Sequence, residues 1–147
     1  MDRTTALIVT LLAGALVAAQ PPVNAMMARH VTDLGAAFVS LAFSTLIVGV
    51  LLVAFGDVSA LRDVTQLRPV HAIAGIAGAA IVVVSLVAVR ELGAGGVTAA
   101  LVTTQLSVSV LLDRLGVLGL HGHAVTTRTL LGVALLFGGT YLVVGNS

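Results

Sequence analysis

The chain has 147 residues, of which 59% are apolar and only 9% are charged, and its mean hydropathy is +1.16. An ordinary soluble domain carries about 25% charged residues, so this composition is typical of an integral membrane protein. A net charge of +1 without any lysine excludes a basic nucleic-acid-binding surface, and the lack of cysteine excludes a disulfide framework and a cysteine-based metal site.

Five apolar stretches divide the chain, separated by arginine, aspartate, proline and glycine residues. Each is close to the roughly 20 residues that a helix needs to cross the hydrocarbon layer. The runs are continuous rather than alternating, which disfavours the strands of a membrane barrel. We therefore expect an all-α integral membrane fold, a single domain over residues 1–147 with five transmembrane helices at about 5–28, 34–55, 70–89, 94–112 and 126–144.

The segments that connect the predicted spans are short. Neither Gly56–Pro69 nor Asp113–Arg128 is long enough for a second domain, so we expect no soluble catalytic module and no enzyme activity. The first apolar run resembles a secretory signal in its small residues before Gln20, but it is long for a signal core and continues through Met27. We expect it to be retained as the first span.

The arginines predict an orientation. Five arginines fall on the side of the N-terminus and two, Arg29 and Arg90, on the other side. The positive-inside rule therefore predicts a cytoplasmic N-terminus. A bias of this size is compatible with some dual insertion.

The first span contains an unusual polar stretch, "AAQPPVNA". Gln20 and Asn24 are four residues apart and share one helical face, while Pro21 and Pro22 each remove a backbone donor and predict a kink in the helix. Two interpretations stay open. In the first, the amides make interhelical hydrogen bonds and the prolines only bend the helix. In the second, the broken helix and its amides form a substrate-facing surface.

The fourth span carries a second polar stripe. Thr98, Gln105, Ser109 and Asp113 are spaced by seven, four and four residues, which places them along one face of a helix. A glutamine amide cannot satisfy all its donors and acceptors against its own helix, so we expect Gln105 to meet Gln20 or Asn24. The predicted substrate-binding residues are Gln20, Asn24, Thr98, Gln105 and Ser109.

None of the six acidic residues is predicted to lie in the middle of a span. Glu91 and Asp113 come nearest, and each adjoins an arginine, so interfacial ion pairs are one interpretation. The other keeps Asp113, Glu91 and Arg90 as candidates for gating or coupling. The predicted cavity is neutral and lined by amides.

Two short motifs do not indicate a cofactor or a metal site. The glycines of "ELGAGG", residues 91–96, follow no strand and precede no Lys-Ser/Thr pair, so a tight turn between helices is predicted rather than a phosphate loop. His121 and His123 lack carboxylate neighbours. We expect no cofactor and no metal.

Several of these residues together resemble the YdcZ family, the small five-helix branch of the drug/metabolite transporter superfamily. The resemblance rests on Gln20 and Asn24, on "AAFVSLAFSTLIVG" at residues 36–49, on "LGAGGVTAALVTTQLSVSVLLDRLG" at residues 92–116, on "HG" at residues 121–122, and on Arg128, Gly132 and Gly138. The Pro21-Pro22 pair is not a fixed feature of that family.

The resemblance implies a multi-pass exporter of the bacterial inner membrane, with a fold like one half of a ten-helix transporter whose two halves are inverted. A lone half is then expected to dimerise, as a homodimer or with an oppositely oriented homologue, because the substrate pocket lies between the halves. The arginine bias opposes an inverted homodimer, since both orientations must then be populated.

We therefore predict a secondary transporter of a small polar metabolite, working by alternating access at the interface of an inverted dimer in the lipid bilayer. Two alternatives stay open. One is a non-transporting membrane subunit whose amides serve helix packing with a partner. The other is a small cation multidrug exporter, which the lack of a mid-membrane acid disfavours.

Overall fold

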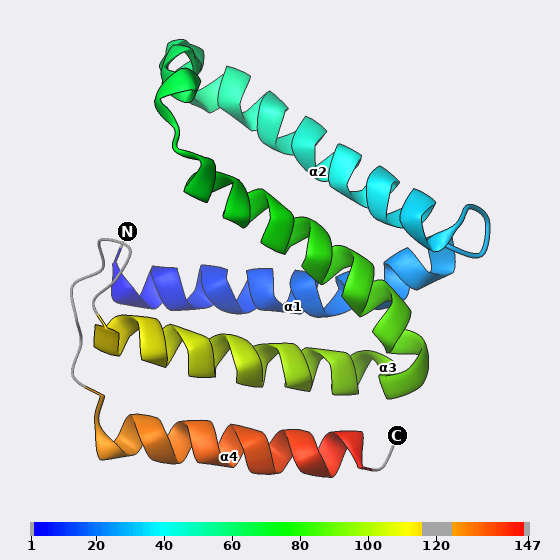
Figure 1. Cartoon of the computed structure of the whole chain (residues 1–147), viewed down its shortest axis with the longest axis vertical. Coiled ribbons are helices and arrows are strands. Elements are labelled where there is room, and N and C mark those ends of the chain that lie inside the picture. The colour runs from blue at the N-terminus through cyan, green and yellow to red at the C-terminus, as the bar shows by residue number, and fades with distance from the viewer. Residues whose placement is uncertain (1, 116–124, 146–147) are drawn as a thin grey trace. The chain divides into compact units, whose positions relative to one another are not determined.

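The computed structural model describes residues 2–115 and 125–145, and every regular element in these residues is helical. Four α-helices, α1 (Arg3–Met27), α2 (Asp33–Phe55), α3 (Ala72–Leu115) and α4 (Thr127–Val144), are joined by two 3-10 helices, η1 (Val58–Gln66) and η2 (Pro69–His71) (Figure 1). The predicted all-α class is confirmed.

The chain forms two compact units. The terminal unit comprises Met1–Ala18 together with Ala88–Ser147, and the central unit comprises Ala19–Val87. The terminal unit thus holds most of α1, the later part of α3 and α4, whereas the central unit holds the end of α1, all of α2 and the first part of α3. The single domain over residues 1–147 stays a prediction.

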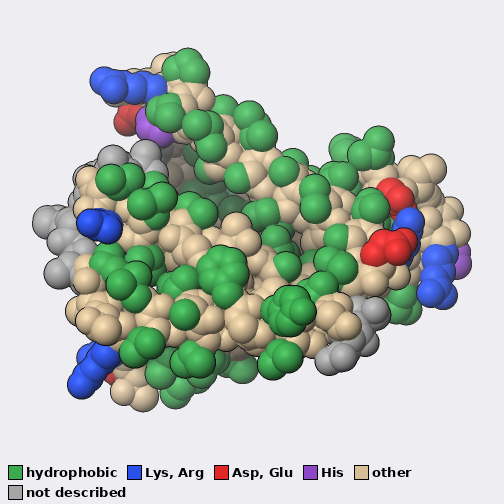
Figure 2. Space-filling view, turned by 60° about the horizontal axis from the view of Figure 1, so that its bottom comes forward, with side chains coloured by type: hydrophobic (Ala, Val, Ile, Leu, Met, Phe, Trp, Pro, Cys, Tyr) green, Lys and Arg blue, Asp and Glu red, His purple; other side chains and the backbone are tan. Residues whose placement is uncertain are grey.

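All four α-helices are long and apolar enough to cross a membrane, as judged from the described residues. Their large apolar side chains are mostly exposed, including Leu34, Phe38, Phe43, Leu46 and Val53 of α2. Hydrophobic side chains cover much of the visible surface, and charged side chains gather in small clusters (Figure 2). Apolar exposure on this scale suits a surface that faces lipid.

The start of α1 is capped by Asp2. The Thr5 backbone N–H donates to Asp2 Oδ1 at 2.8 Å, and the Thr5 hydroxyl lies 3.1 Å from Asp2 Oδ2. The backbone donor, followed by the hydroxyl, lowers the pKa of Asp2 below its usual value. An ionised carboxylate is therefore retained at the positive end of the helix.

The helix α1 continues through Pro21 and Pro22 to Met27. Neither proline can donate to the carbonyl four residues earlier, so Val17 and Ala18 lack their usual helical donors. The boundary between the two compact units falls directly after Ala18. The boundary between the units therefore coincides with the part of α1 that lacks two helical hydrogen bonds. The kink predicted from the sequence stays a prediction.

A small core holds the central unit together. Ala37 of α2 packs with Val82 and Leu86 of α3, and Leu86 is fully buried. Ala28, Leu41 and Val83 pack against this cluster. Small residues on α2 allow the close approach, because Ala36 and Ala37 are both buried.

The helix α3 is interrupted at Gly93, whose backbone angles are φ 66° and ψ 169°. The backbone kinks at this residue, where two helices meet. The sequence predicted separate spans ending at residue 89 and starting at 94, but helix continues on both sides of this one residue. The described helices therefore supply four to five candidate spans, because each side of α3 is about one crossing long, and the count of five stays a prediction.

The two predicted connections are partly helical. The 3-10 helix η1 occupies most of the segment Gly56–Pro69, and η2 begins at Pro69. The helix α3 extends to Leu115, past its predicted end at Leu112. The rest of the second connection, residues 116–124 with His121 and His123, lies outside the described residues.

Replacing Gly93 by alanine is expected to destabilise the protein by about 1–3 kcal/mol, because the observed backbone angles are nearly restricted to glycine. No neighbouring atom lies within 4 Å of the added methyl group, so backbone strain alone produces the loss. Gly132→Ala in α4 is the matched control, because its methyl also meets open space but its backbone is helical. Thermal unfolding in detergent measures the stability of both variants. Equal melting temperatures would contradict the assignment of a glycine-specific backbone conformation to residue 93.

Candidate functional site

The predicted site residues fall in both compact units. Gln20 is half-buried and Asn24 is buried, and both belong to the part of α1 in the central unit. Thr98 is half-buried, and Gln105 and Ser109 are exposed, on the part of α3 in the terminal unit. The expected meeting of Gln105 with Gln20 or Asn24 would join the two units, and it stays a prediction.

Asn24 is the most unusual polar residue of the central unit. Its side chain is only 2% exposed, and its buried Nδ2 has no hydrogen-bond partner among the described residues. Its backbone is regular, because the Asn24 carbonyl accepts from the Ala28 N–H at 2.9 Å. The unsatisfied group is therefore the side-chain Nδ2.

Asn24 lies one helical turn before Ala28, which packs against the core of Ala37, Val82 and Leu86. A buried donor without a partner costs about 1–3 kcal/mol. Ser85, another buried polar residue of this unit, avoids that cost because its hydroxyl donates to the Val82 carbonyl at 3.3 Å. Asn24 thus weakens the unit in the described conformation.

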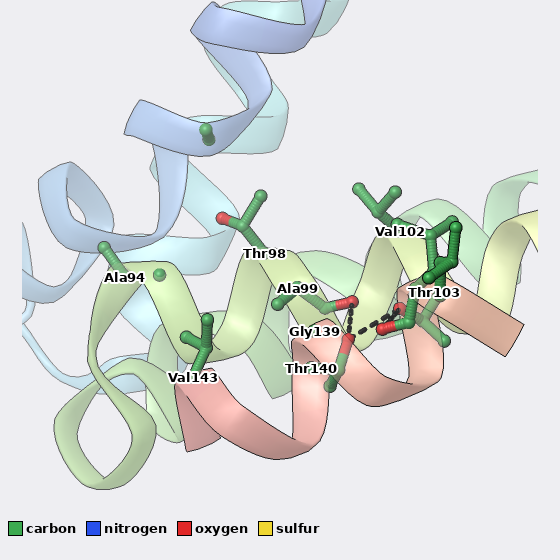
Figure 3. A pocket seen from close by; sticks show the side chains of 12 residues that line it. Ala94, Thr98, Ala99, Val102, Thr103, Gly139, Thr140 and Val143 are labelled. Carbon is green, nitrogen blue, oxygen red and sulfur yellow. Dashed lines mark hydrogen bonds between the residues drawn. The ribbon is translucent and has the colours of Figure 1, made fainter. Parts of the chain in front are cut away.

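The terminal unit contains a cavity of about 530 Å³ (Figure 3). Its walls come from α3 and α4, with Ala18 of α1 contributing as well. A volume of this size lies within the range of roughly 300–1,000 Å³ that is usual for small-molecule sites. Most of its lining is small and aliphatic, including Ala94, Gly95, Ala99, Val102, Gly139 and Val143.

Two threonines on the cavity wall join α3 to α4. Thr103 Oγ1 and Thr140 Oγ1 lie 2.7 Å apart. Thr140 Oγ1 also lies 3.1 Å from the Ala99 carbonyl, and Thr103 Oγ1 lies 3.4 Å from the Leu136 carbonyl. These hydroxyls are engaged in helix packing, which the sequence analysis missed because spacing along one helix does not reveal the partner helix.

Thr98 is the one predicted site residue that lines this cavity. Its side chain points away from the hydrogen-bonded pair of Thr103 and Thr140 (Figure 3). Gln105 and Ser109, lower on the same stripe, are not among the lining residues. The cavity therefore presents aliphatic surface and the Thr98 hydroxyl.

The gating candidates lie toward the ends of the two α3 segments. Arg90 and Glu91 are exposed just before the break at Gly93, and Asp113 is half-buried near the end of α3 at Leu115. Within the described residues, no group of three or more histidine, cysteine, aspartate or glutamate side chains could hold a metal ion.

Comparison with protein families decides the class of the protein. The family model described as "Putative inner membrane exporter, YdcZ" matches residues 5–142. The chain belongs to the YdcZ family. No curated protein and no solved structure matches it.

This YdcZ-family protein is a multi-pass protein of the inner membrane, because the match covers nearly the whole chain and its helices are long enough to span the bilayer. The family is one of exporters, so the protein is a membrane transporter in general terms. The family resemblance inferred from the sequence is confirmed. The residues that bind substrate stay predictions.

Replacing Asn24 by leucine is expected to raise the stability of this YdcZ-family protein by about 1–3 kcal/mol, because it removes an unsatisfied buried donor. Ser85→Ala is the matched control, since Ser85 is also buried but already hydrogen-bonded, and a small loss or no change is expected there. Thermal unfolding in detergent measures both. A lower melting temperature for Asn24→Leu would mean that the amide holds the fold together.

Proposed function

We propose that the protein is a secondary transporter that exports a small polar metabolite by alternating access, at the interface of an inverted dimer. The unsatisfied amide of Asn24 is the observation that carries this proposal. The assignment to an exporter family supports the general class. The polar residues of α1 and α3 are the proposed substrate-binding groups.

A buried polar side chain without a partner in an apolar span costs free energy, so its presence needs a physical explanation. Any aliphatic residue at position 24 would avoid the cost of the unsatisfied donor, and polar groups at membrane depth commonly mark substrate or ion pathways. Asn24 is buried as described, so a ligand or water reaches its Nδ2 only after the helices around it move. That property fits an alternating-access protein, in which a site is closed in one conformation and open in another.

The irregularity of α1 fits the same mechanism. Pro21 and Pro22 each leave a carbonyl of α1 without its helical donor, beside Gln20 and Asn24. Transporters commonly bind substrate where helices are discontinuous near the middle of the bilayer. Gln20 and Asn24 therefore lie next to the interruption of α1, whereas Gly93 lies between the two crossing-length segments of α3.

The proposed substrate is neutral or weakly charged. Gln20, Asn24, Thr98, Gln105 and Ser109 offer amide and hydroxyl groups without a formal charge. Glu91, Arg90 and Asp113 belong to gating or coupling in this proposal, because they carry formal charge and lie toward the ends of the two α3 segments. Export of organic cations is disfavoured, since such cargo usually needs an acid inside the span.

An inverted dimer supplies the second half of the pocket. The fold would correspond to one half of a ten-helix drug/metabolite transporter, and the exposed apolar helix faces allow a second subunit to pack. The partner is a second copy or an oppositely oriented homologue. The excess of arginines on the N-terminal side supports a cytoplasmic N-terminus and favours the homologue.

The alternative of a non-transporting subunit has one observation in its favour. The hydroxyls of Thr103 and Thr140 are used for packing α3 against α4, so polar residues in this chain do serve assembly. If Asn24 and Gln105 served the same purpose toward a partner subunit, their removal would weaken the assembly without any effect on a transported solute.

Flux in proteoliposomes tests the proposal. A counterflow screen of labelled amino acids, sugars and short organic acids is expected to yield at least one solute with saturating uptake. Asn24→Leu and Gln105→Ala are each expected to lower that flux by about tenfold, the loss that corresponds to one hydrogen bond of roughly 1.4 kcal/mol, while the dimer persists.

Ser44→Ala is the control for this experiment. Its hydroxyl bonds to the Ser40 carbonyl of its own helix α2 at 3.0 Å and lies outside the proposed site, so its flux is expected to be unchanged. The lack of saturation for every solute, together with dissociation of the Asn24→Leu and Gln105→Ala dimers, would replace the transporter proposal with the packing subunit.

A further inference from the structure

The connection between α2 and α3 has an apolar ridge that no transport role accounts for. Within η1, Val58, Leu61 and Val64 follow one another at every third residue. A 3-10 helix has three residues per turn, so side chains at this spacing lie directly above one another. These three side chains, named here the η1 ridge, are between 48% and 55% exposed.

The other two sides of η1 are polar. Ser59, Arg62 and Thr65 follow the same three-residue spacing on one side, and Asp63 and Gln66 do so on the other. The Gln66 Nε2 donates to Asp63 Oδ1 at 2.9 Å, which shows two members of one side stacked on each other. The helix is therefore amphipathic, because its apolar side chains repeat every three residues, which is one turn of a 3-10 helix.

Local hydrogen bonds explain where η1 begins and ends. Asp57 caps its start, because the Ser59 backbone N–H donates to Asp57 Oδ1 at 2.9 Å. Leu67 ends it with an extended backbone, and its N–H donates to the Val64 carbonyl at 3.1 Å. The alignment of the ridge thus stops at the residue where the helix stops.

The length of η1 calls for additional stabilisation. It spans nine residues, whereas 3-10 helices longer than three or four residues are uncommon because their hydrogen-bond geometry is poor. Burial of the η1 ridge would supply that stabilisation, but the ridge is exposed in the described chain. A surface outside the chain is therefore needed to cover it.

The position of η1 in the chain identifies that surface. The helix α2 ends at Phe55, shortly before η1, and η2 ends at His71, directly before α3 starts at Ala72. Both α2 and α3 are long and apolar enough to cross the membrane. The segment is thus attached at both ends to membrane-length helices, and it is held at the surface of the bilayer.

We propose that the η1 ridge inserts into the boundary between lipid headgroups and acyl chains, so that the segment lies on the membrane rather than in water. Amphipathic helices bind this boundary through their apolar side. Arg62 and Arg68 are balanced by Asp57 and Asp63, so insertion depends on the apolar ridge and not on anionic lipid. The ridge then anchors the end of α2 and the start of α3 at a fixed depth.

Single tryptophans test this inference, because the natural chain contains none. Leu61→Trp and Val64→Trp place the probe on the ridge, and the adjacent Arg62→Trp and Thr65→Trp place it on a polar side. The full-length variants are reconstituted in phosphatidylcholine vesicles, with part of the lipid brominated in the upper acyl chain. Quenching by bromolipid and by aqueous acrylamide is compared for each variant.

The ridge tryptophans are expected to be quenched by bromolipid about twofold or more strongly than the controls, and less strongly by acrylamide. The difference is expected to persist when phosphatidylglycerol is added. Equal bromolipid quenching of the two pairs would overturn the inference, and so would ridge tryptophans shielded from both quenchers, which would indicate packing against protein. The result does not depend on transport, so it is separate from any test of the proposed function.

Discussion

Backbone hydrogen bonding in hydrocarbon is the constraint on which the structure depends. A backbone donor or acceptor without a partner is costly where water is absent, so the chain satisfies these groups inside helices. The apolar side chains can then face lipid, and only a small core such as that of Ala37, Val82 and Leu86 is needed within the central unit. Within the described spans, Pro21 and Pro22 depart from this pattern, because each leaves a carbonyl of α1 without its helical donor.

The polar side chains separate into two groups by the same criterion. Thr103, Thr140 and Ser85 have hydrogen-bond partners in the described chain, so their burial serves packing. Asn24 has none for its Nδ2, and its burial adds an energetic cost to the described conformation. The polar residues that pack helices together thus have hydrogen-bond partners. Asn24, which we propose to serve transport, leaves its Nδ2 without one.

The sequence predicted the helices better than it predicted the site. Apolar runs placed α1, α2 and α4 within a few residues of their observed bounds, because lipid requires long uninterrupted helices. It missed η1, whose apolar residues repeat every third position rather than at the α-helical period, and the pairing of Thr103 with Thr140, which depends on the partner helix. Gln20, Asn24 and Gln105 were chosen by polarity and helical spacing, and their expected meeting stays a prediction because it would join the two compact units.

Access of water to Asn24 tests the central claim most directly. The chain has no natural cysteine, so Asn24→Cys can be treated in membranes with a membrane-impermeant thiol reagent, and Leu86→Cys, at a fully buried apolar position of the same unit, serves as the control. Labelling of both after denaturation establishes that each thiol is present. The account predicts that Asn24→Cys reacts in the membrane while Leu86→Cys does not, and equal protection of the two would contradict it.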